Sequence, residues 1–291
     1  MAKYFYIQVS DASHMGISGN GQKYRKHYLI FIAAVILILV GITIYSGIFP
    51  PASVVESYSM EHSDNWQYGI IDEGTIVMVK KVNNIDNVIT YVQGRSDNSS
   101  SYGEYGNVIL YHNSALGVIT IHRAMFYLSW NGSNPEIEGY HNQSYVHIYN
   151  DNIIMEGIGY AHRNLIVNVS GYKGDSGFIT VGDHNLATLS KDSPYYNRTY
   201  NAYYASDQSI WGIKPVSINE IVGKAYGYIP WFGLIKLNIL RLEGKWPRQD
   251  YTNVPKYSYL DLSLSIIAII GLILFPYKKT YNKLKGALRN S

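Results

Sequence analysis

Two long apolar segments stand out in this chain of 291 residues, one near each end. The first, 28–49 (YLIFIAAVILILVGITIYSGIF), contains no charged residue. At about 22 residues it is long enough to cross a hydrocarbon core of roughly 30 Å as a helix. The second, 258–277 (SYLDLSLSIIAIIGLILFPY), has an Ile/Leu-rich centre and a single acid, Asp261, near its start. Both segments are therefore predicted to be transmembrane helices.

The charges that flank these segments predict their orientation. A Lys/Arg cluster precedes the first segment, and a basic tail, 278–291, follows the second. Because positive clusters stay on the cytoplasmic side, 1–27 and 278–291 are expected to be cytoplasmic tails of a cell-membrane protein, with 50–257 outside. Two alternatives stay open. The first segment could be a cleaved signal peptide, although it lies late and no clear small-x-small site follows it. The second could be a buried core helix.

The region between the apolar segments is patterned as short β-strands. Its apolar stretches are rich in Val, Ile, Thr and Tyr, and clusters of Gly, Asn, Asp and Ser separate them. No long stretch has helical periodicity, so a mainly β domain built on an antiparallel sheet is expected. Two polar stretches, 93–105 and the Tyr-rich 189–206, are expected to be loops. The predicted strands are 75–81, 107–111, 117–122, 145–149, 165–169 and 177–181.

Composition removes several classes of function. The chain has no cysteine, so neither a disulfide framework nor thiol chemistry is available. The net charge of +3 comes largely from the two tails and does not indicate a nucleic-acid binder. No cofactor or metal site is expected, since no H-E-x-x-H or other persuasive zinc spacing is present. All N-x-[ST] sequons lie in the middle region, at Asn98, Asn131, Asn142, Asn168 and Asn197, which fits its external placement.

A hydrolase without cysteine needs a hydroxyl nucleophile and a base. Ser59 lies in ESYSME, shortly after the first apolar segment, and His122 ends the predicted strand GVITIH. Asp183 follows the strand GFITV within GDHN, where a carboxylate can orient a histidine on a neighbouring strand. Each feature alone also fits a simpler interpretation: a solvated serine, a structural histidine and a β-turn.

Taken in order, these segments resemble a specific family. Ser-Met after a membrane span is followed by the strand TIVMV, then IHR, then FITVGDHN, and finally IVGKAYGYIPWFGLIKL at 221–237. This set resembles signal peptidase I, in the form found in archaea and in the endoplasmic reticulum (peptidase family S26). The match runs in patches from about 54 to 240. The fold implied is the mainly β catalytic domain of that family. No lysine lies between Lys81 and Lys173, where bacterial relatives carry a lysine base, so the Ser-His form is favoured.

The sequence also departs from the family pattern. His62 stands where the family usually has proline, GDHN replaces GDNN, and the first strand is preceded by Glu73-Gly74-Thr75 instead of Gly-Asp. A second aspartate normally follows GDNN closely, but here the insertion at 189–206 intervenes. Asp207 is the best candidate for it. The acid therefore stays open between Asp183 and Asp207.

The resemblance implies a serine endopeptidase that removes signal peptides from exported preproteins. Ser59 would be the nucleophile, His122 the general base, and Asp183 or Asp207 the orienting acid. Ser57 and Met60 are the candidate oxyanion and substrate-binding residues. Expected partners are signal-peptide-bearing preproteins, membrane lipids and, as a further candidate, the protein-export channel. Two alternatives stay open: a non-catalytic membrane-anchored surface β-domain, and a retained but inactive peptidase fold.

Overall fold

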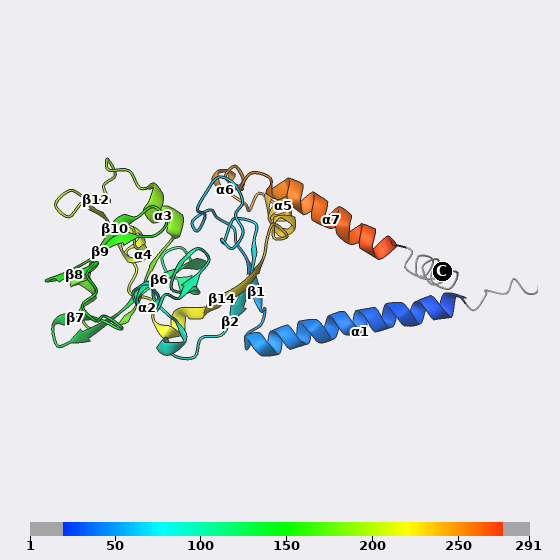
Figure 1. Ribbon diagram of the computed structural model, residues 1–291, viewed down its shortest axis with the longest axis horizontal. Coiled ribbons are helices and arrows are strands. Elements are labelled where there is room, and N and C mark those ends of the chain that lie inside the picture. The colour runs from blue at the N-terminus through cyan, green and yellow to red at the C-terminus, as the bar shows by residue number, and fades with distance from the viewer. Residues whose placement is uncertain (1–19, 276–291) are drawn as a thin grey trace, which may run out of the picture. The chain divides into compact units, whose positions relative to one another are not determined.

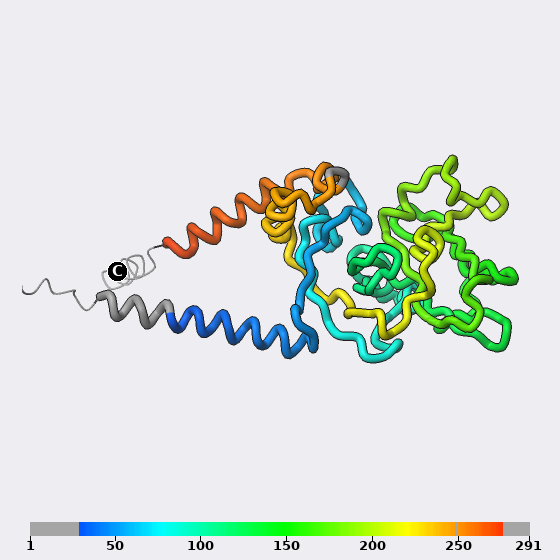
Figure 2. Tube along the Cα trace, turned by 180° about the vertical axis from the view of Figure 1, so that it is seen from behind, coloured from blue at the N-terminus to red at the C-terminus, as the bar shows by residue number. Residues whose placement is uncertain are grey.

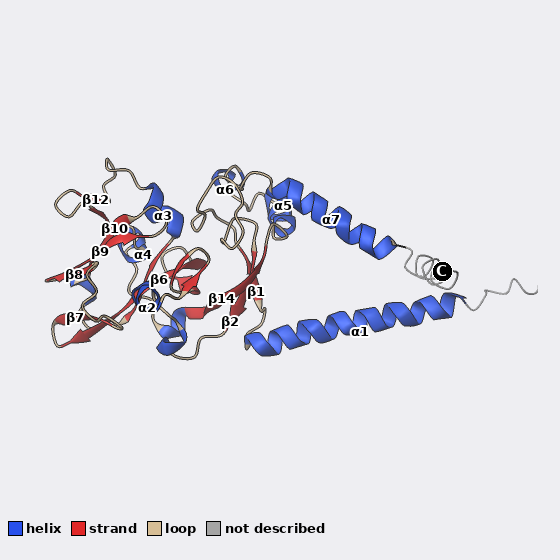
Figure 3. Ribbon diagram, in the orientation of Figure 1, coloured by secondary structure: helices blue, strands red, loops and turns tan. Residues whose placement is uncertain are grey.

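The computed structural model describes residues 20–275, and the chain divides into two compact units, Met1–Tyr45 and Ser46–Ser291. The described part of the first unit belongs to helix α1 (Asn20–Ser46). The described part of the second unit contains the strands, which short helices and loops connect (Figure 3). The expected tail 278–291 lies outside the described residues, as does 1–19 of the other tail.

Helix α1 carries the first apolar segment. Residues Leu29–Ser46 have a mean hydropathy of 2.8 and are mostly exposed, and α1 is the one helix in 20–275 that is long and apolar enough to cross a membrane. The helix ends at Ser46, short of the expected boundary at 49. Gly47 adopts a left-handed conformation (φ 72°) and Pro50 follows it, so the helix stops here.

The first sheet has seven strands in the order β1-β2-β14-β5-β6-β11, with β7 added beside β6. All of its pairings are antiparallel. Strand β6 is long enough, at 14 residues, to pair with β5, then β11, then β7 (Figure 1). The strands are β1 (Ala52–Val54), β2 (Ile76–Lys80), β5 (Val108–Asn113), β6 (Val118–Asn131), β7 (Asn134–Ile137), β11 (Gly177–Val181) and β14 (Ile221–Ile229).

The second sheet has the order β12-β13-β10-β9-β8 and is antiparallel apart from the β10–β13 pair. It lies at the end of its unit away from β1 and β2, seen from both sides in Figures 1 and 2. The largest core cluster joins β6 and β11 to β9 and β10 through fully buried Phe126, Ile179, Ile153 and Leu165. The strands are β8 (Val146–Tyr149), β9 (Asn152–Ile158), β10 (Arg163–Asn168), β12 (Tyr196–Asn197) and β13 (Ala202–Tyr203).

The expectation of a mainly β, antiparallel domain is confirmed, but both predicted loops contain regular structure. The stretch 93–105 includes most of helix α2 (Tyr91–Asp97) and the small hairpin of β3 (Ser100–Ser101) and β4 (Glu104–Tyr105). A capping box between Thr90 and Gln93 starts α2. The stretch 189–206 forms β12 and β13 and buries Ala202 and Tyr203, so it contributes to the core.

Helices at the C-terminal end of the unit pack together. Leu234 and Leu237 of α5 (Leu234–Leu242) are buried with Leu262 of α7 (Ser258–Leu274), and α6 (Arg248–Tyr251) lies between them in sequence. Helix α7 is apolar but has 17 residues, and the end of the predicted span 258–277 lies outside the described residues. The remaining short helices are η1 (Ile85–Asn87), η2 (Ser170–Tyr172), α3 (Asp183–Thr188), α4 (Asp207–Trp211) and η3 (Ile218–Glu220).

Candidate active site

Ser59 lies on a tight turn in the connection between β1 and β2. The turn is closed by a backbone hydrogen bond from the Glu61 N–H to the Tyr58 carbonyl (3.1 Å). Met60 is only 1% exposed and packs among Val55 and Val77 in a core cluster. The buried Met60 side chain therefore presents no surface to a substrate and instead anchors the turn, which leaves the neighbouring Ser59 side chain half-buried at the surface.

His122 lies in the first half of β6, opposite Ile109 of β5, and is 4% exposed. The next residue, Arg123, pairs with both β5 and β11, so hydrogen bonds fix the backbone that carries the imidazole. The His122 Nε2 atom lies 3.0 Å from Ser59 Oγ. Two residues far apart in sequence are thus within direct hydrogen-bond distance.

Asp207 completes a chain of contacts with these two residues. Its Oδ2 atom lies 2.7 Å from His122 Nδ1, and Asp207 is fully buried at the start of α4. The same oxygen accepts hydrogen bonds from the hydroxyls of Tyr111 (2.7 Å) and Thr180 (2.6 Å). Of the two candidate acids, Asp207 is the one that contacts His122.

These contacts define the protonation pattern of the histidine. Oδ2 of the Asp207 carboxylate is an acceptor, so His122 Nδ1 must carry the proton that joins them. In the neutral imidazole the other nitrogen, Nε2, then has a free lone pair directed at Ser59 Oγ. The arrangement can accept the Ser59 proton at Nε2, as a general base does.

Tyr111 and Thr180 reach Asp207 because of strand register. Tyr111 pairs with Thr120, and Thr180 pairs with Ala124, so both lie in register with residues two positions from His122. Side chains two residues apart in a strand share a face, which places all three on the same side of the sheet. Burial raises the pKa of the Tyr111 hydroxyl, so this group stays a hydrogen-bond donor.

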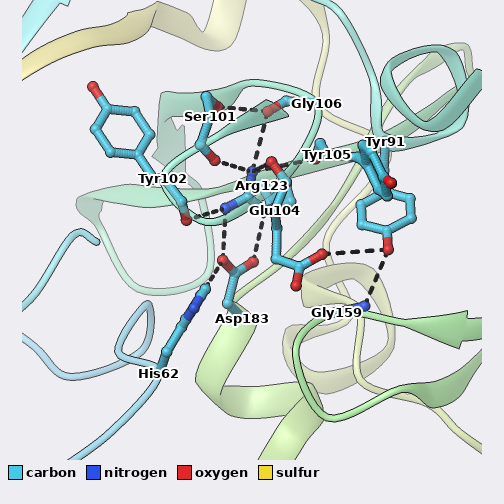
Figure 4. A network of polar contacts seen from close by, with 10 residues as sticks. All are labelled: His62, Tyr91, Ser101, Tyr102, Glu104, Tyr105, Gly106, Arg123, Gly159 and Asp183. Carbon is cyan, nitrogen blue, oxygen red and sulfur yellow. Dashed lines mark hydrogen bonds and ion pairs between the residues drawn. The ribbon is translucent and has the colours of Figure 1, made fainter. Parts of the chain in front are cut away.

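Asp183 makes different contacts. The Arg123 guanidinium binds both of its carboxylate oxygens, through Nε (2.8 Å) and Nη2 (2.7 Å), and His62 Nε2 lies 2.9 Å from Oδ2 (Figure 4). Burial alone would raise the pKa of Asp183, but Arg123 and His62 hold it at about 2. Asp183 is therefore a fixed anion facing the opposite side of β6 from His122, since Arg123 is the next residue along the strand.

Arg123 also fixes the hairpin that faces Asp183. Figure 4 shows its guanidinium surrounded by backbone carbonyl groups of this hairpin. The planar fork of donors suits several acceptors at once, which a lysine ammonium would satisfy less well. The accepting carbonyls belong to Ser101, Tyr102, Glu104, Tyr105 and Gly106.

The turn between β11 and α3 approaches Ser59 through its backbone. The His184 N–H donates to the Ser59 carbonyl (3.0 Å). A Cβ atom on Gly182 would lie 2.7 Å from that carbonyl oxygen and 2.8 Å from His122 Nε2. Only glycine allows this close approach. The GDHN segment thus contributes its backbone to the site, whereas its carboxylate was the feature that suggested it.

Ser57 places a second hydroxyl beside the candidate nucleophile. Its Oγ atom lies 3.3 Å from Ser59 Oγ, on the same turn. This position is consistent with the oxyanion-binding role that the sequence resemblance implies for Ser57.

Buried acids lie beneath this turn. Glu61 accepts a hydrogen bond from the Glu73 N–H (3.1 Å), and the Glu73 carboxylate accepts one from Trp246 Nε1 (3.0 Å). Burial raises the pKa of Glu61 to about 8 and that of Glu73 to about 9. The adjacent Asp72 is also buried, and its pKa rises to about 6 for the same reason. The Ser59 turn is therefore connected to Trp246 through Glu61 and Glu73, whose carboxyl groups favour the protonated form at neutral pH.

Three residues of this site, Tyr111, Thr180 and His62, could not be identified from the sequence alone. Tyr111 and Thr180 could be found once the register of β5, β6 and β11 is known, because alternation then places them beside His122. In the sequence, His62 differs from the proline that is usual in the family, and nothing in its neighbourhood indicates an ion pair with Asp183. Comparison with known proteins adds no assignment: no family model matches the chain, and no curated protein matches it.

Proposed function

We propose that this protein is a membrane-bound serine endopeptidase that removes signal peptides from exported preproteins. The observation that carries the proposal is the continuous chain of contacts Ser59 Oγ to His122 Nε2 (3.0 Å) and His122 Nδ1 to Asp207 Oδ2 (2.7 Å). A nucleophile, a base in direct contact and an acid that fixes the base are the three parts that serine acyl transfer requires.

In the proposed reaction, Ser59 Oγ attacks the scissile carbonyl carbon while His122 Nε2 takes its proton. Asp207 stabilises the imidazolium that forms. His122 then gives the proton to the leaving amine, which releases the mature protein and leaves the signal peptide as an ester on Ser59. A water molecule, deprotonated by His122, hydrolyses that ester and frees Ser59.

The developing oxyanion needs donors close to Ser59. The Ser57 hydroxyl, 3.3 Å from Ser59 Oγ, and the backbone N–H of Ser59 are the proposed donors. Loss of one such donor typically costs about 2.7–4 kcal/mol of transition-state stabilisation. By the family resemblance, the substrate carries small residues at the first and third positions before the cut.

The membrane setting supports this substrate class. Helix α1 is apolar and mostly exposed over Leu29–Ser46, and Ser59 follows it after a short stretch of chain. In α7, Leu264, Ile267 and Ile270 are exposed, which supports a second membrane span in this part of the chain. In this proposal both termini are cytoplasmic and the β domain is external. Enzyme and signal peptide then share one bilayer, which raises their effective concentration.

The alternative of a non-catalytic surface β-domain has less support from the geometry. A surface module has no requirement for a serine, a histidine and an aspartate from three separate segments to converge within hydrogen-bond distance. The buried hydroxyls of Tyr111 and Thr180 on Asp207 would likewise have no purpose beyond packing in such a module.

The test is cleavage of a preprotein in membranes that contain the chain. Wild type should release the mature protein, with the cut after the signal peptide mapped by mass spectrometry, and Ser59→Ala should not. Ser63→Ala, which removes another hydroxyl from the same connection without a contact to His122, is the matched control and should cleave like wild type. Equal cleavage by wild type and Ser59→Ala would reject Ser59 as nucleophile. No cleavage by folded wild type would favour the surface module.

A further inference from the structure

The connection that carries Ser59 is held to the rest of the domain by more than its own turn. On one side the Ser59 carbonyl accepts from the His184 N–H. On the other, the His62 side chain reaches Asp183, the residue immediately before His184, at 2.9 Å. The backbone contact fixes the chain at Ser59, and the side-chain contact fixes it at His62. Both contacts lead to the first residues of α3.

The His62 ring has a defined position. It stacks on the Tyr160 ring, with centroids 4.3 Å apart and planes 26° from parallel. On the hairpin side, a Cβ atom on Gly103 would come within 3.0 Å of the His62 Cε1 atom. The His62 side chain is 7% exposed. The imidazole is thus enclosed by the β9–β10 turn and the β3–β4 hairpin, and its Nε2 atom points at Asp183 (Figure 4).

The acceptor is equally fixed. Arg123 binds Asp183 through two nitrogen atoms and is itself 1% exposed, so the carboxylate cannot turn away from His62. Because Asp183 is an anion held by Arg123, His62 Nε2 donates the hydrogen bond. Arg123 directly follows His122 on β6. The contacts therefore connect His62, through Asp183 and Arg123, to the strand that carries the base.

We propose that His62 is a positioning residue. By donating a hydrogen bond from Nε2 to Asp183, it holds the segment that carries Ser59 at hydrogen-bond distance from His122. This inference rests on the proposed function, and it adds a residue for which the family resemblance offers no counterpart. His62 touches neither Ser59 nor His122, so it acts on the reaction only through the position of Ser59.

Two substitutions separate the hydrogen bond from the ring. His62→Phe keeps an aromatic ring to stack on Tyr160 but has no donor for Asp183. His62→Gln keeps an N–H donor near the position of Nε2 but has no ring. His147→Phe is the matched control, because His147 also faces a carboxylate, Glu156 (3.5 Å), and also stacks on a tyrosine, but in the second sheet.

For preprotein cleavage, His62→Phe should lower kcat on the order of 10²-fold, because a misplacement of about 1 Å has an effect of that size. KM should stay at the wild-type value, since the His62 side chain is enclosed by Tyr160 and the β3–β4 hairpin and is only 7% exposed. His62→Gln should restore most of kcat, and His147→Phe should match wild type. Wild-type kcat in His62→Phe, or a loss in His62→Gln equal to that in His62→Phe, would overturn the inference.

Amide hydrogen exchange at 57–62 measures how firmly the backbone of this segment is held, and it needs no substrate. Exchange there should be faster in His62→Phe than in wild type and should return toward wild type in His62→Gln. Unchanged exchange in His62→Phe would contradict the inference even if the protein has another activity. If Ser59→Ala cleaves like wild type, the proposed function fails, and the exchange data still decide whether His62 holds the segment.

Discussion

Asp183 and Asp207 carry the same functional group, yet the residues around them differ. Asp207 accepts from His122, Tyr111 and Thr180 on one oxygen. Asp183 is shared between Arg123 and His62. The sequence leaves the two open because the family pattern has an aspartate in GDNN and a second one soon after it, and the insertion at 189–206 separates Asp207 from GDHN. The choice depends on which face of β6 each one meets, and that is set by register.

Asn substitutions should separate the two acids. Asp207→Asn should lower the cleavage rate by up to about 10⁴-fold with little loss of stability, because an amide no longer fixes the proton on His122 Nδ1. Asp183→Asn should lower the free energy of unfolding by about 3–5 kcal/mol, because it leaves the buried Arg123 charge uncompensated. Cleavage rate and thermal unfolding, measured side by side, check both. An Asp207→Asn protein with wild-type kcat would contradict the assignment.

Gly182 provides a second test at single-residue scale. Gly182→Ala adds one methyl group, which would lie 2.7 Å from the Ser59 carbonyl oxygen and 2.8 Å from His122 Nε2. The Ser59 backbone and the His122 ring must then shift away from the methyl group, which disturbs the contact between them, so kcat should fall on the order of 10²-fold. Gly171→Ala is the control, because its Cβ atom would meet no atom within 4 Å. Equal activity in the two variants would show that the close approach at Gly182 is unimportant.

At the scale of elements, alternation predicted the strands that carry chemistry but not all of their partners. The predicted strand 117–122 is the start of β6, which continues to Asn131 because Met125, Phe126 and Leu128 find a core on the second sheet. Strand β9 and the two-residue strands of 189–206 were not predicted. The β9 sequence, NIIMEGI, is apolar but does not alternate, and the stretch 189–206 is polar and Tyr-rich. Both form strands because neighbouring strands pair with them.

The acids beneath the Ser59 turn predict how this part of the domain responds to pH. Glu61 and Glu73 have folded pKa values of about 8 and about 9, above the ordinary value of 4.5. Between pH 4.5 and 8 the folded protein therefore holds protons that the unfolded chain has lost. The stabilisation is complete below pH 4.5, decreases as pH rises from 4.5 toward the folded pKa values of about 8 and about 9, and is fully lost above them. The decrease amounts to at most about 1.4 kcal/mol per pH unit for each group.

Denaturant unfolding at pH 5 and pH 8 checks this expectation. The free energy of unfolding of the wild type should be larger at pH 5 than at pH 8. Glu73→Gln keeps an acceptor for Trp246 but has no ionisable group, so it should make the difference between the two pH values smaller. Glu243→Gln removes an exposed acid paired with Lys245 and should leave the difference unchanged. Wild-type stability that rises from pH 5 to pH 8 would contradict the assignment of these carboxyls.

At the scale of the whole molecule, a peptidase with two membrane spans and an external β domain has both termini on the cytoplasmic side. The chain has no cysteine, so a single introduced thiol is the only reactive one. In intact cells, an impermeant maleimide should label Asp192→Cys, an exposed position in the β domain, but neither Ser18→Cys nor Ser291→Cys. All three should react after lysis. Labelling of Ser291→Cys in intact cells would exclude α7 as part of a second span.

The most direct test of the central claim is whether Ser59, His122 and Asp207 act as one catalytic unit on a preprotein. The cleavage rates of Ser59→Ala, of His122→Ala and of a triple variant that combines both with Asp207→Ala should be compared in the same membranes. Residues that act as a unit are strongly non-additive, so we predict that the triple variant is no slower than Ser59→Ala alone. Losses that multiply from one variant to the next, or cleavage by Ser59→Ala at the wild-type rate, would contradict the account.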